Sequence, residues 1–183
     1  RIEFTLKSGL MWSNGYGEVT TEDVAFSYDR MAQSEWKGDY VAYDHTEITD
    51  KYSGAIILNQ PFAPFMTATL ASGTGIISCK KATEAVGGKF TNDVPATCGP
   101  YVMEWKQGQH VRMTRNPEWM GDKPQWDEIE ALIVTEDEAA ALAYEAGELD
   151  CTQITSNSYA RYLKELPANS TLNVAGALQY MWM

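Results

Sequence analysis

The segment best suited to bind or transform another molecule is a short loop of small residues, Ala71-Ser72-Gly73-Thr74-Gly75. Such loops can hold a phosphate with backbone N–H groups, but a phosphate-binding loop also needs a Lys followed by Ser or Thr, which is missing at the required spacing. Glycine lets a backbone approach its neighbour closely. The loop is therefore predicted to contact either a ligand or a packed part of the chain.

The titratable side chains do not form a catalytic set. Glu136-Asp137-Glu138 follow Thr135 at a predicted helix start, where the helix dipole favours acidic residues. His45 follows Asp44, but no Gly-x-Ser-x-Gly segment supplies a nucleophile. With His110 as the second and last histidine, a zinc site is not supported. We predict no catalytic residue, no metal and no cofactor, and therefore a protein that is not an enzyme.

Three cysteines, Cys79, Cys98 and Cys151, form no Cys-x-x-Cys pair. In an oxidising compartment two of them could form a disulfide, and Cys79 with Cys98 is the favoured pair. The alternative is that all three are small buried hydrophobic side chains.

The composition is that of a globular, acidic chain. Of the 183 residues 44% are hydrophobic, enough for a core, and the net charge is −11. This charge repels phosphate backbones, which excludes nucleic acid as a partner. No apolar run reaches the roughly 18 residues of a membrane helix. The chain starts at Arg1 without a leader and ends inside an apolar run at residues 178–183, so we expect a fragment of a longer mature chain.

Hydrophobic periodicity and turn residues predict the elements that position these groups. Thr20, Glu22 and Asp23 indicate a capped helix start. Residues 80–96 are predicted to form a helical turn and a long connection. Strands are predicted at 2–6, 46–49, 55–58, 101–105, 111–114 and 129–134, and further helices at 65–70, 135–147 and 157–166. This order indicates an α/β, mixed α+β fold without internal repeats.

Aromatic and turn residues are densest between Ala96 and Gly121. The pattern predicts a hairpin around Gly108, ended by Asn116-Pro117. Each buried ring would contribute about 1.5–3 kcal/mol. The predicted role of this stretch is structural: it locks the hairpin and its exit loop onto a core.

Three segments resemble one known family. CGPYVMEWKQGQHVRMTRNPEWMG, residues 98–121, contains Gly-Pro-Tyr, Trp, a Gly turn and Arg-Asn-Pro before an aromatic residue and Gly. FTLKSGLMWSNGYGEVTTEDVAFSYDRM, residues 4–31, contains a strand, a turn and a Thr-x-Glu-Asp-Val helix start. AAALAYEAGELDCTQI, residues 139–154, ends its helix in Ala-Gly-Glu-Leu-Asp. In this order they resemble family 5 extracellular solute-binding proteins, the peptide-, oligopeptide- and nickel-binding partners of ABC importers. Cys98 and Asn14 depart from the family's usual Thr and Asp.

The resemblance implies a partial lobe of a two-lobed, periplasmic-binding-protein-like fold. Residues 1–96 would form the smaller subdomain of lobe I, as strand, helix and hairpin. Residues 97–183 would form its core subdomain, running to the hinge, and the second lobe would be absent from this chain.

It also implies a function: capture of peptides or similar small solutes outside the cytoplasmic membrane and their delivery to an ABC permease. Such proteins are periplasmic or extracellular, either free or tethered to the membrane. An alternative on the same scaffold is a ligand-binding module that feeds a chemoreceptor or sensor. The apolar run at 178–183 predicts a homodimer through that edge. By resemblance, the ligand-binding positions are Trp36, Gly73, Thr74, Gly75, Gln153, Tyr180 and Trp182.

Overall fold

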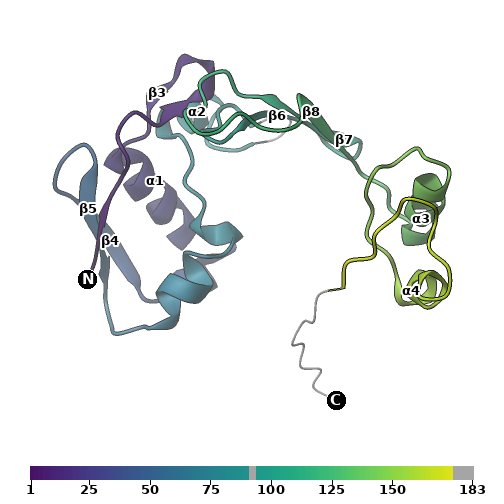
Figure 1. Cartoon of the computed structure of the whole chain (residues 1–183). Helices are drawn as coiled ribbons and strands as arrows, with labels where there is room; N and C mark the ends of the chain where they lie inside the picture. Colours follow the sequence, from purple (N-terminus) through teal and green to yellow (C-terminus); the bar gives the residue numbers. More distant parts are fainter. Residues whose placement is uncertain (91–93, 175–183) are drawn as a thin grey trace. The chain divides into compact units, whose positions relative to one another are not determined.

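A computed structural model describes residues 1–90 and 94–174 (Figure 1). Contacts within the chain define two compact units, residues 1–132 and 133–183. Strands and helices are mixed, as predicted. The predicted boundary between residues 96 and 97 concerns subdomains of a complete lobe and stays a prediction.

The first unit begins with a three-stranded antiparallel sheet. Its strand order is β1 (Ile2–Thr5), β5 (Ser53–Leu58) and β4 (Tyr43–Ile48), so β5 is central. The predicted strands at 46–49 and 55–58 are confirmed as parts of β4 and β5, which pair with each other. Gly54 is needed here because a Cβ would lie 2.6 Å from the carbonyl oxygen of Glu47.

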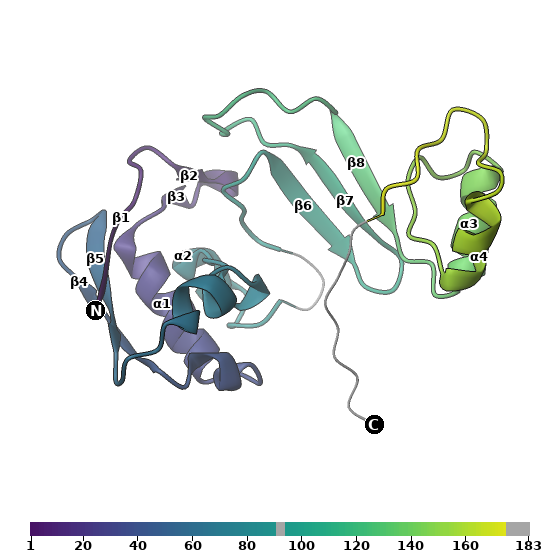
Figure 2. The same ribbon diagram turned by 60° about the horizontal axis from the view of Figure 1, so that its bottom comes forward.

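Helix α1 (Thr21–Ala32) packs against β4 (Figure 2). The predicted start is confirmed: Thr20 and Asp23 form a capping box, in which each side chain binds the other residue's backbone N–H. The helix buries Val24 and Tyr28 against the sheet. The core around them also contains η2 (Lys37–Tyr40) and η3 (Phe65–Thr69); its buried members are Val24, Tyr28, Tyr40, Tyr43, Ile56 and Phe65.

A second core of the first unit involves β2 (Met11–Trp12), β3 (Gly17–Glu18) and α2 (Lys80–Ala85). Asp23, only 6% exposed, links these parts. Its carboxylate accepts hydrogen bonds from the Trp12 indole (3.2 Å) and from the backbone N–H groups of Thr20 (2.9 Å) and Lys80 (2.8 Å). Hydrogen bonds to an ionised acceptor are stronger than neutral ones. The core's buried members are Trp12, Val19, Cys79, Ala82 and Ala96.

A three-stranded antiparallel sheet follows, in the order β6 (Tyr101–Lys106), β7 (His110–Arg115) and β8 (Glu128–Leu132). The predicted hairpin is confirmed, and Gly108 in its turn has a φ of 74°, which favours glycine. Because side chains alternate between faces, one face carries a charged row on β7 and β8. There Arg112 lies 3.3 Å from Glu128 and 3.5 Å from Glu130.

Asn116 ties the two ends of the hairpin together. It is 5% exposed, and its side-chain amide donates to the Gly99 carbonyl at 2.8 Å. Its backbone N–H donates to the Pro100 carbonyl at 2.9 Å. Its side-chain oxygen accepts from the Glu118 N–H at 3.0 Å, which sets the turn after β7. The hairpin is therefore closed at its base by a single buried side chain.

The exit loop folds back on the hairpin through Arg115 and Tyr101. Both side chains donate to the carbonyl of Trp126, at 3.0 and 3.1 Å. Gly121 lies under the Trp119 ring, since a Cβ there would come within 2.5 Å of the indole. These contacts fix the exit loop on the hairpin, but Tyr101, Trp105 and Trp119 are only half-buried and belong to neither core cluster, so the predicted locking onto a core is not confirmed.

The second unit contains α3 (Asp137–Glu145) and α4 (Ser156–Tyr162). The N-cap position of α3 is Glu136, one residue later than the predicted Thr135, and its side chain makes no capping hydrogen bond. Gly147 follows the helix with a φ of 78°. Glu138 joins the helices by accepting hydrogen bonds from the hydroxyls of Thr155 (2.9 Å) and Ser158 (3.0 Å).

The helix predicted at residues 157–166 is only partly correct. Tyr162 is buried and donates to the Glu145 carboxylate at 2.7 Å. The helix ends at Tyr162, so Leu163 and Leu166 lie beyond it and are 62% and 41% exposed. The prediction was wrong for these two residues because it extended the helix to Leu166.

Candidate functional site

The loop of small residues follows η3 and contains η4 (Gly73–Gly75). Thr74 is 8% exposed, and its hydroxyl lies 2.7 Å from that of Ser72. The Tyr40 hydroxyl donates to the Thr74 carbonyl at 2.7 Å. Burial raises the pKa of Tyr40, so this hydroxyl keeps its proton and remains a donor at neutral pH. Thr74 is thus held by the protein itself.

The two glycines of the loop differ in their surroundings. A Cβ on Gly75 would lie 2.2 Å from the Leu70 carbonyl oxygen, so the backbone here packs on the end of η3. Gly73 is exposed, and a Cβ on it would meet nothing within 4 Å. Of the two predicted alternatives, contact with a packed part of the chain is therefore correct at Gly75. Gly73, by contrast, is accessible to a ligand.

Trp36 is 62% exposed and directly precedes η2. Its backbone is fixed: its N–H donates to the Ser34 hydroxyl, and its carbonyl accepts from Asp39, both at 3.0 Å. Tyr40, at the end of η2, connects this segment to Thr74. Sequence reasoning missed Tyr40, because an aromatic residue in a short polar segment does not reveal which carbonyl its hydroxyl will reach.

Gln153 lies in the second unit and lines a cavity of about 430 Å³. Its side chain is exposed and has no hydrogen-bond partner among the residues that the structure describes. Of the described residues that line the cavity, Asp150 is the only charged one. The Tyr144 hydroxyl donates to Ser170 at 2.7 Å, which fixes part of the wall. The polar lining consists of Tyr144, Asp150, Thr152, Gln153, Tyr162, Ser170, Thr171 and Asn173.

The seven predicted ligand positions lie partly in the first unit, partly in the second unit and partly outside the described residues. Trp36 and the loop belong to the first unit, and Gln153 belongs to the second. Tyr180 and Trp182, with the dimer edge at 178–183, lie outside the described residues. The joint site and the dimer stay predictions.

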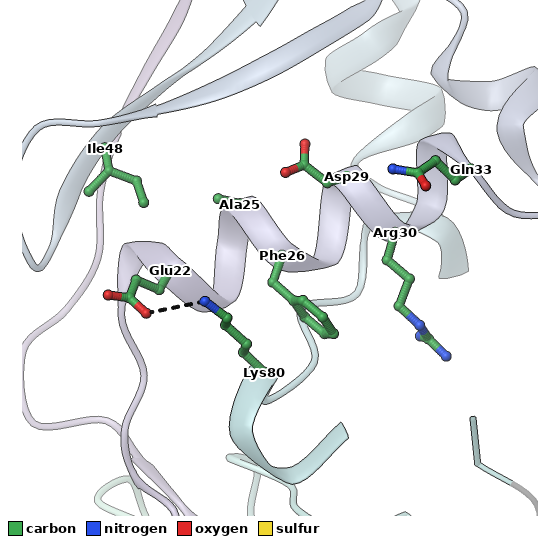
Figure 3. Close-up of a pocket in the computed structure, with 8 residues that line it drawn as sticks. All are labelled: Glu22, Ala25, Phe26, Asp29, Arg30, Gln33, Ile48 and Lys80. Atoms are coloured by element: carbon green, nitrogen blue, oxygen red, sulfur yellow. Dashed lines mark ion pairs between the residues drawn. The ribbon is translucent and has the colours of Figure 1, made fainter. Parts of the chain in front are cut away.

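A cavity of about 560 Å³ is lined by residues of α1 together with Ile48 of β4 and Lys80 of α2, and it contains none of the predicted positions (Figure 3). Its charged groups already have partners. Lys80 lies 3.6 Å from Glu22, the Asp29 carboxylate accepts from Tyr43 at 2.6 Å, and Arg30 donates to the carbonyl of residue 88 at 3.0 Å. This surface therefore offers a ligand little uncompensated charge.

All three cysteines are free thiols in the structure. Cys79 is buried and caps α2, its sulfur accepting from the Ala82 N–H at 3.5 Å. Cys98 is half-buried and packs against the same core. Burial raises the pKa of both thiols. The disulfide between Cys79 and Cys98 is not formed in this structure.

Metal binding and histidine-based catalysis find little support in the described residues. Within residues 1–90 and 94–174 no three His, Cys, Asp or Glu side chains gather as a metal site. His45 lies 2.8 Å from Asp44, but both side chains are about half exposed. None of the helices in the described part of the chain is long and apolar enough to cross a membrane.

The model of the family "Bacterial extracellular solute-binding proteins, family 5 Middle" matches residues 1–183. The chain therefore belongs to this family, which confirms the resemblance seen in the sequence. The fold is a part of one lobe of the family's two-lobed binding fold. Members of this family are solute-binding transport proteins and not enzymes.

Two curated relatives and two solved structures illustrate the similarity. The probable D,D-dipeptide-binding periplasmic protein DdpA of Escherichia coli K12 is 28% identical over 80% of this chain and 30% of its own length. The oligopeptide-binding protein AppA of Bacillus subtilis is 23% identical over 84% of this chain and, again, 30% of its own length. The chain thus spans about a third or less of these relatives.

Among solved structures, MoaA of A. tumefaciens R10 in complex with mannopinic acid has a TM-score of 0.79 and 33% identity, covering 91% of this chain and 34% of MoaA. AppA of B. subtilis in complex with a nonapeptide has a TM-score of 0.76 and 22% identity, covering 88% of this chain and 34% of AppA. The second similarity shows the fold alone.

Proposed function

We propose that the protein containing this chain is the substrate-binding component of an ABC importer that captures peptides or similar small solutes outside the cytoplasmic membrane. The match of the family model to all of residues 1–183 carries this proposal. The relatives' names, a dipeptide-binding and an oligopeptide-binding protein, support peptides as the solute class. The protein performs no chemistry on its ligand, and its partner is the importer's permease.

The cavity at Gln153 is suited to the amino end of such a solute. Asp150 provides its single charge, and a carboxylate attracts an ammonium group and repels another carboxylate. The Gln153 amide can both donate and accept, so it can pair with a peptide group. In the first unit, exposed Trp36 and Gly73 offer a ring and an open backbone.

The first test is native mass spectrometry of the full-length protein, purified without refolding. A co-purified mass equal to short peptides supports the proposal. An empty protein that also ignores a peptide library contradicts the peptide class. If a different solute, such as mannopinic acid, is bound, the proposed role in solute capture stands and the proposed substrate changes. Transport of the bound solute only when permease and ATPase are present separates an importer component from a sensor module.

The second test concerns Asp150. Asp150→Asn should weaken binding of a peptide with a free amino terminus about tenfold, equivalent to about 1.4 kcal/mol. An N-acetylated peptide carries no ammonium group, so its affinity should not change. Asp122→Asn removes the same charge from an exposed loop of the first unit and serves as the control. Equal losses for both peptides would contradict the assignment of Asp150 to the amino end. Titration calorimetry measures all of these affinities.

A further inference from the structure

We propose that Cys79 and Cys98 form an intramolecular disulfide when the protein meets a disulfide-bearing oxidant. Both side chains belong to one core: Cys79 is among its buried members, and Cys98 packs against it. Cys151, the remaining cysteine, is exposed and lies in the second unit. The pairing is independent of the solute and of the proposed function.

Hydrogen bonds hold the two cysteines beside the same short segment, Trp12-Ser13. The Ser13 N–H donates to the Thr97 carbonyl at 2.8 Å, and the Thr97 N–H donates to the Ser13 hydroxyl at 3.1 Å. These two hydrogen bonds fix Thr97, the residue before Cys98. On the other side, Trp12 and the N–H of Lys80 bind the same carboxylate, that of Asp23. The residue after Cys79 is thereby fixed to that segment as well.

The environment favours pairing over metal binding or general reactivity. No group of three His, Cys, Asp or Glu side chains that could hold a metal occurs in the described residues. Burial, and to a lesser extent the Asp23 carboxylate, raise the pKa of both thiols and so disfavour the thiolate, which is the form that attacks disulfides. We therefore expect oxidation to be slow in the folded protein and fastest while the chain folds. The product is a structural bond and not a rapid redox switch.

The reaction is a thiol–disulfide exchange in two steps. The more accessible Cys98 loses its proton, attacks one sulfur of the oxidant and releases the other as a thiol. Cys79 then loses its proton and attacks the mixed disulfide at the Cys98 sulfur, releasing the second thiol. The two cysteine sulfurs are oxidised, the oxidant's disulfide is reduced to two thiols, and the two protons end on those thiols.

The bond would fasten the start of α2 to the segment that leads into β6. Closing the stretch from residue 79 to residue 98 restricts the unfolded chain, which raises the unfolding temperature by about 5–10 °C.

The test uses the full chain, folded in the presence of oxidised glutathione and then alkylated with iodoacetamide in denaturant without reductant. We expect alkylation at Cys151 alone, and a pair of linked peptides containing residues 79 and 98 whose mass is lower by two hydrogen atoms than that of the reduced pair. Alkylation of all three cysteines, or a link that includes Cys151, would overturn the proposal.

Two variants separate the bond from packing effects. Cys151→Ser should behave like the original chain, whereas Cys98→Ser should leave Cys79 open to alkylation. Dithiothreitol should lower the unfolding temperature of the oxidised original chain by about 5–10 °C and leave that of Cys98→Ser unchanged. Because reduction acts on the original chain, this measurement remains decisive even if Cys98→Ser fails to fold. An unfolding temperature that does not respond to dithiothreitol would overturn the proposal.

Discussion

Gly75→Ala tests whether the loop after η3 is positioned by close packing on the chain. The added Cβ would lie 2.2 Å from the Leu70 carbonyl oxygen and 2.7 Å from its carbonyl carbon, whereas real Cβ contacts essentially never fall below 3.0 Å. The loop would have to move by roughly 1 Å, because this neighbour is backbone and cannot rotate away. That movement would disturb the Gly75 N–H bond to the Ser72 carbonyl, now 3.0 Å.

The cost follows from these two effects. Overpacking a close contact costs about 1–3 kcal/mol, and a lost hydrogen bond adds about 1 kcal/mol. We therefore expect Gly75→Ala to lower the free energy of unfolding by about 2–4 kcal/mol. Gly73→Ala is the matched control, since its Cβ would meet nothing within 4 Å and its φ is not in the left-handed region. It should be neutral or stabilising by about 0.4–1 kcal/mol.

Urea unfolding followed by far-UV circular dichroism measures both variants, provided that the m-value stays constant. Equal midpoints for Gly75→Ala and Gly73→Ala would refute the packing argument. Solute affinity adds a second result, because Gly73 is the open member of the loop. A stable Gly73→Ala protein with weakened binding would support its place in the ligand surface.

Three further outcomes are expected. Asn116→Ala should cost about 2–3 kcal/mol in urea unfolding, because it leaves a hairpin-base carbonyl without its donor, while Glu118→Ala on the same turn should change little. Glu138→Ala should cost about 1–2 kcal/mol by removing the link between α3 and α4, seen as faster amide exchange in α4. Hydrogen bonds from Lys51 and from the Gly9 N–H lower the pKa of Glu18 from 4.5 to about 2. Stability from this group is therefore complete above pH 4.5 and is lost as the pH falls towards 2. In Glu18→Gln, the free energy of unfolding should therefore fall less steeply as the pH is lowered below 4.5. An unchanged pH dependence would contradict the role given to Glu18.

Elements set by local chemistry were predictable from the sequence. The capping box of α1 involves residues three apart, and the β6–β7 hairpin depends on a glycine turn between two strands. The pairing of β1 with β5 was not predicted, because it joins residues about fifty positions apart. The end of α4 was misplaced because its exposed leucines continue the helical period without being buried.

The candidate site was predictable only at the level of segments. Gly73 and Gly75 look equivalent in the sequence, yet one is open and the other packs against Leu70. The partner of the Thr74 carbonyl, Tyr40, lies thirty-four residues earlier. Such contacts follow from tertiary packing. The family resemblance indicates which segments are involved, but it does not show which atoms meet.

The shared carboxylate of Asp23 makes three distant parts of the chain interdependent. The Trp12 indole and the Thr20 hydroxyl bind this carboxylate through their side chains, so the effects of substitutions at Trp12, Thr20 and Asp23 on stability will not add. Thr20 and Lys80 also bind it through backbone N–H groups, which a substitution retains. Loss of one contact leaves the others with a less constrained acceptor, and the starts of α1 and α2 will open together during native-state fluctuations. The buried carboxylate of Asp23 therefore constrains how this part of the sequence can diverge, for reasons that are independent of the ligand.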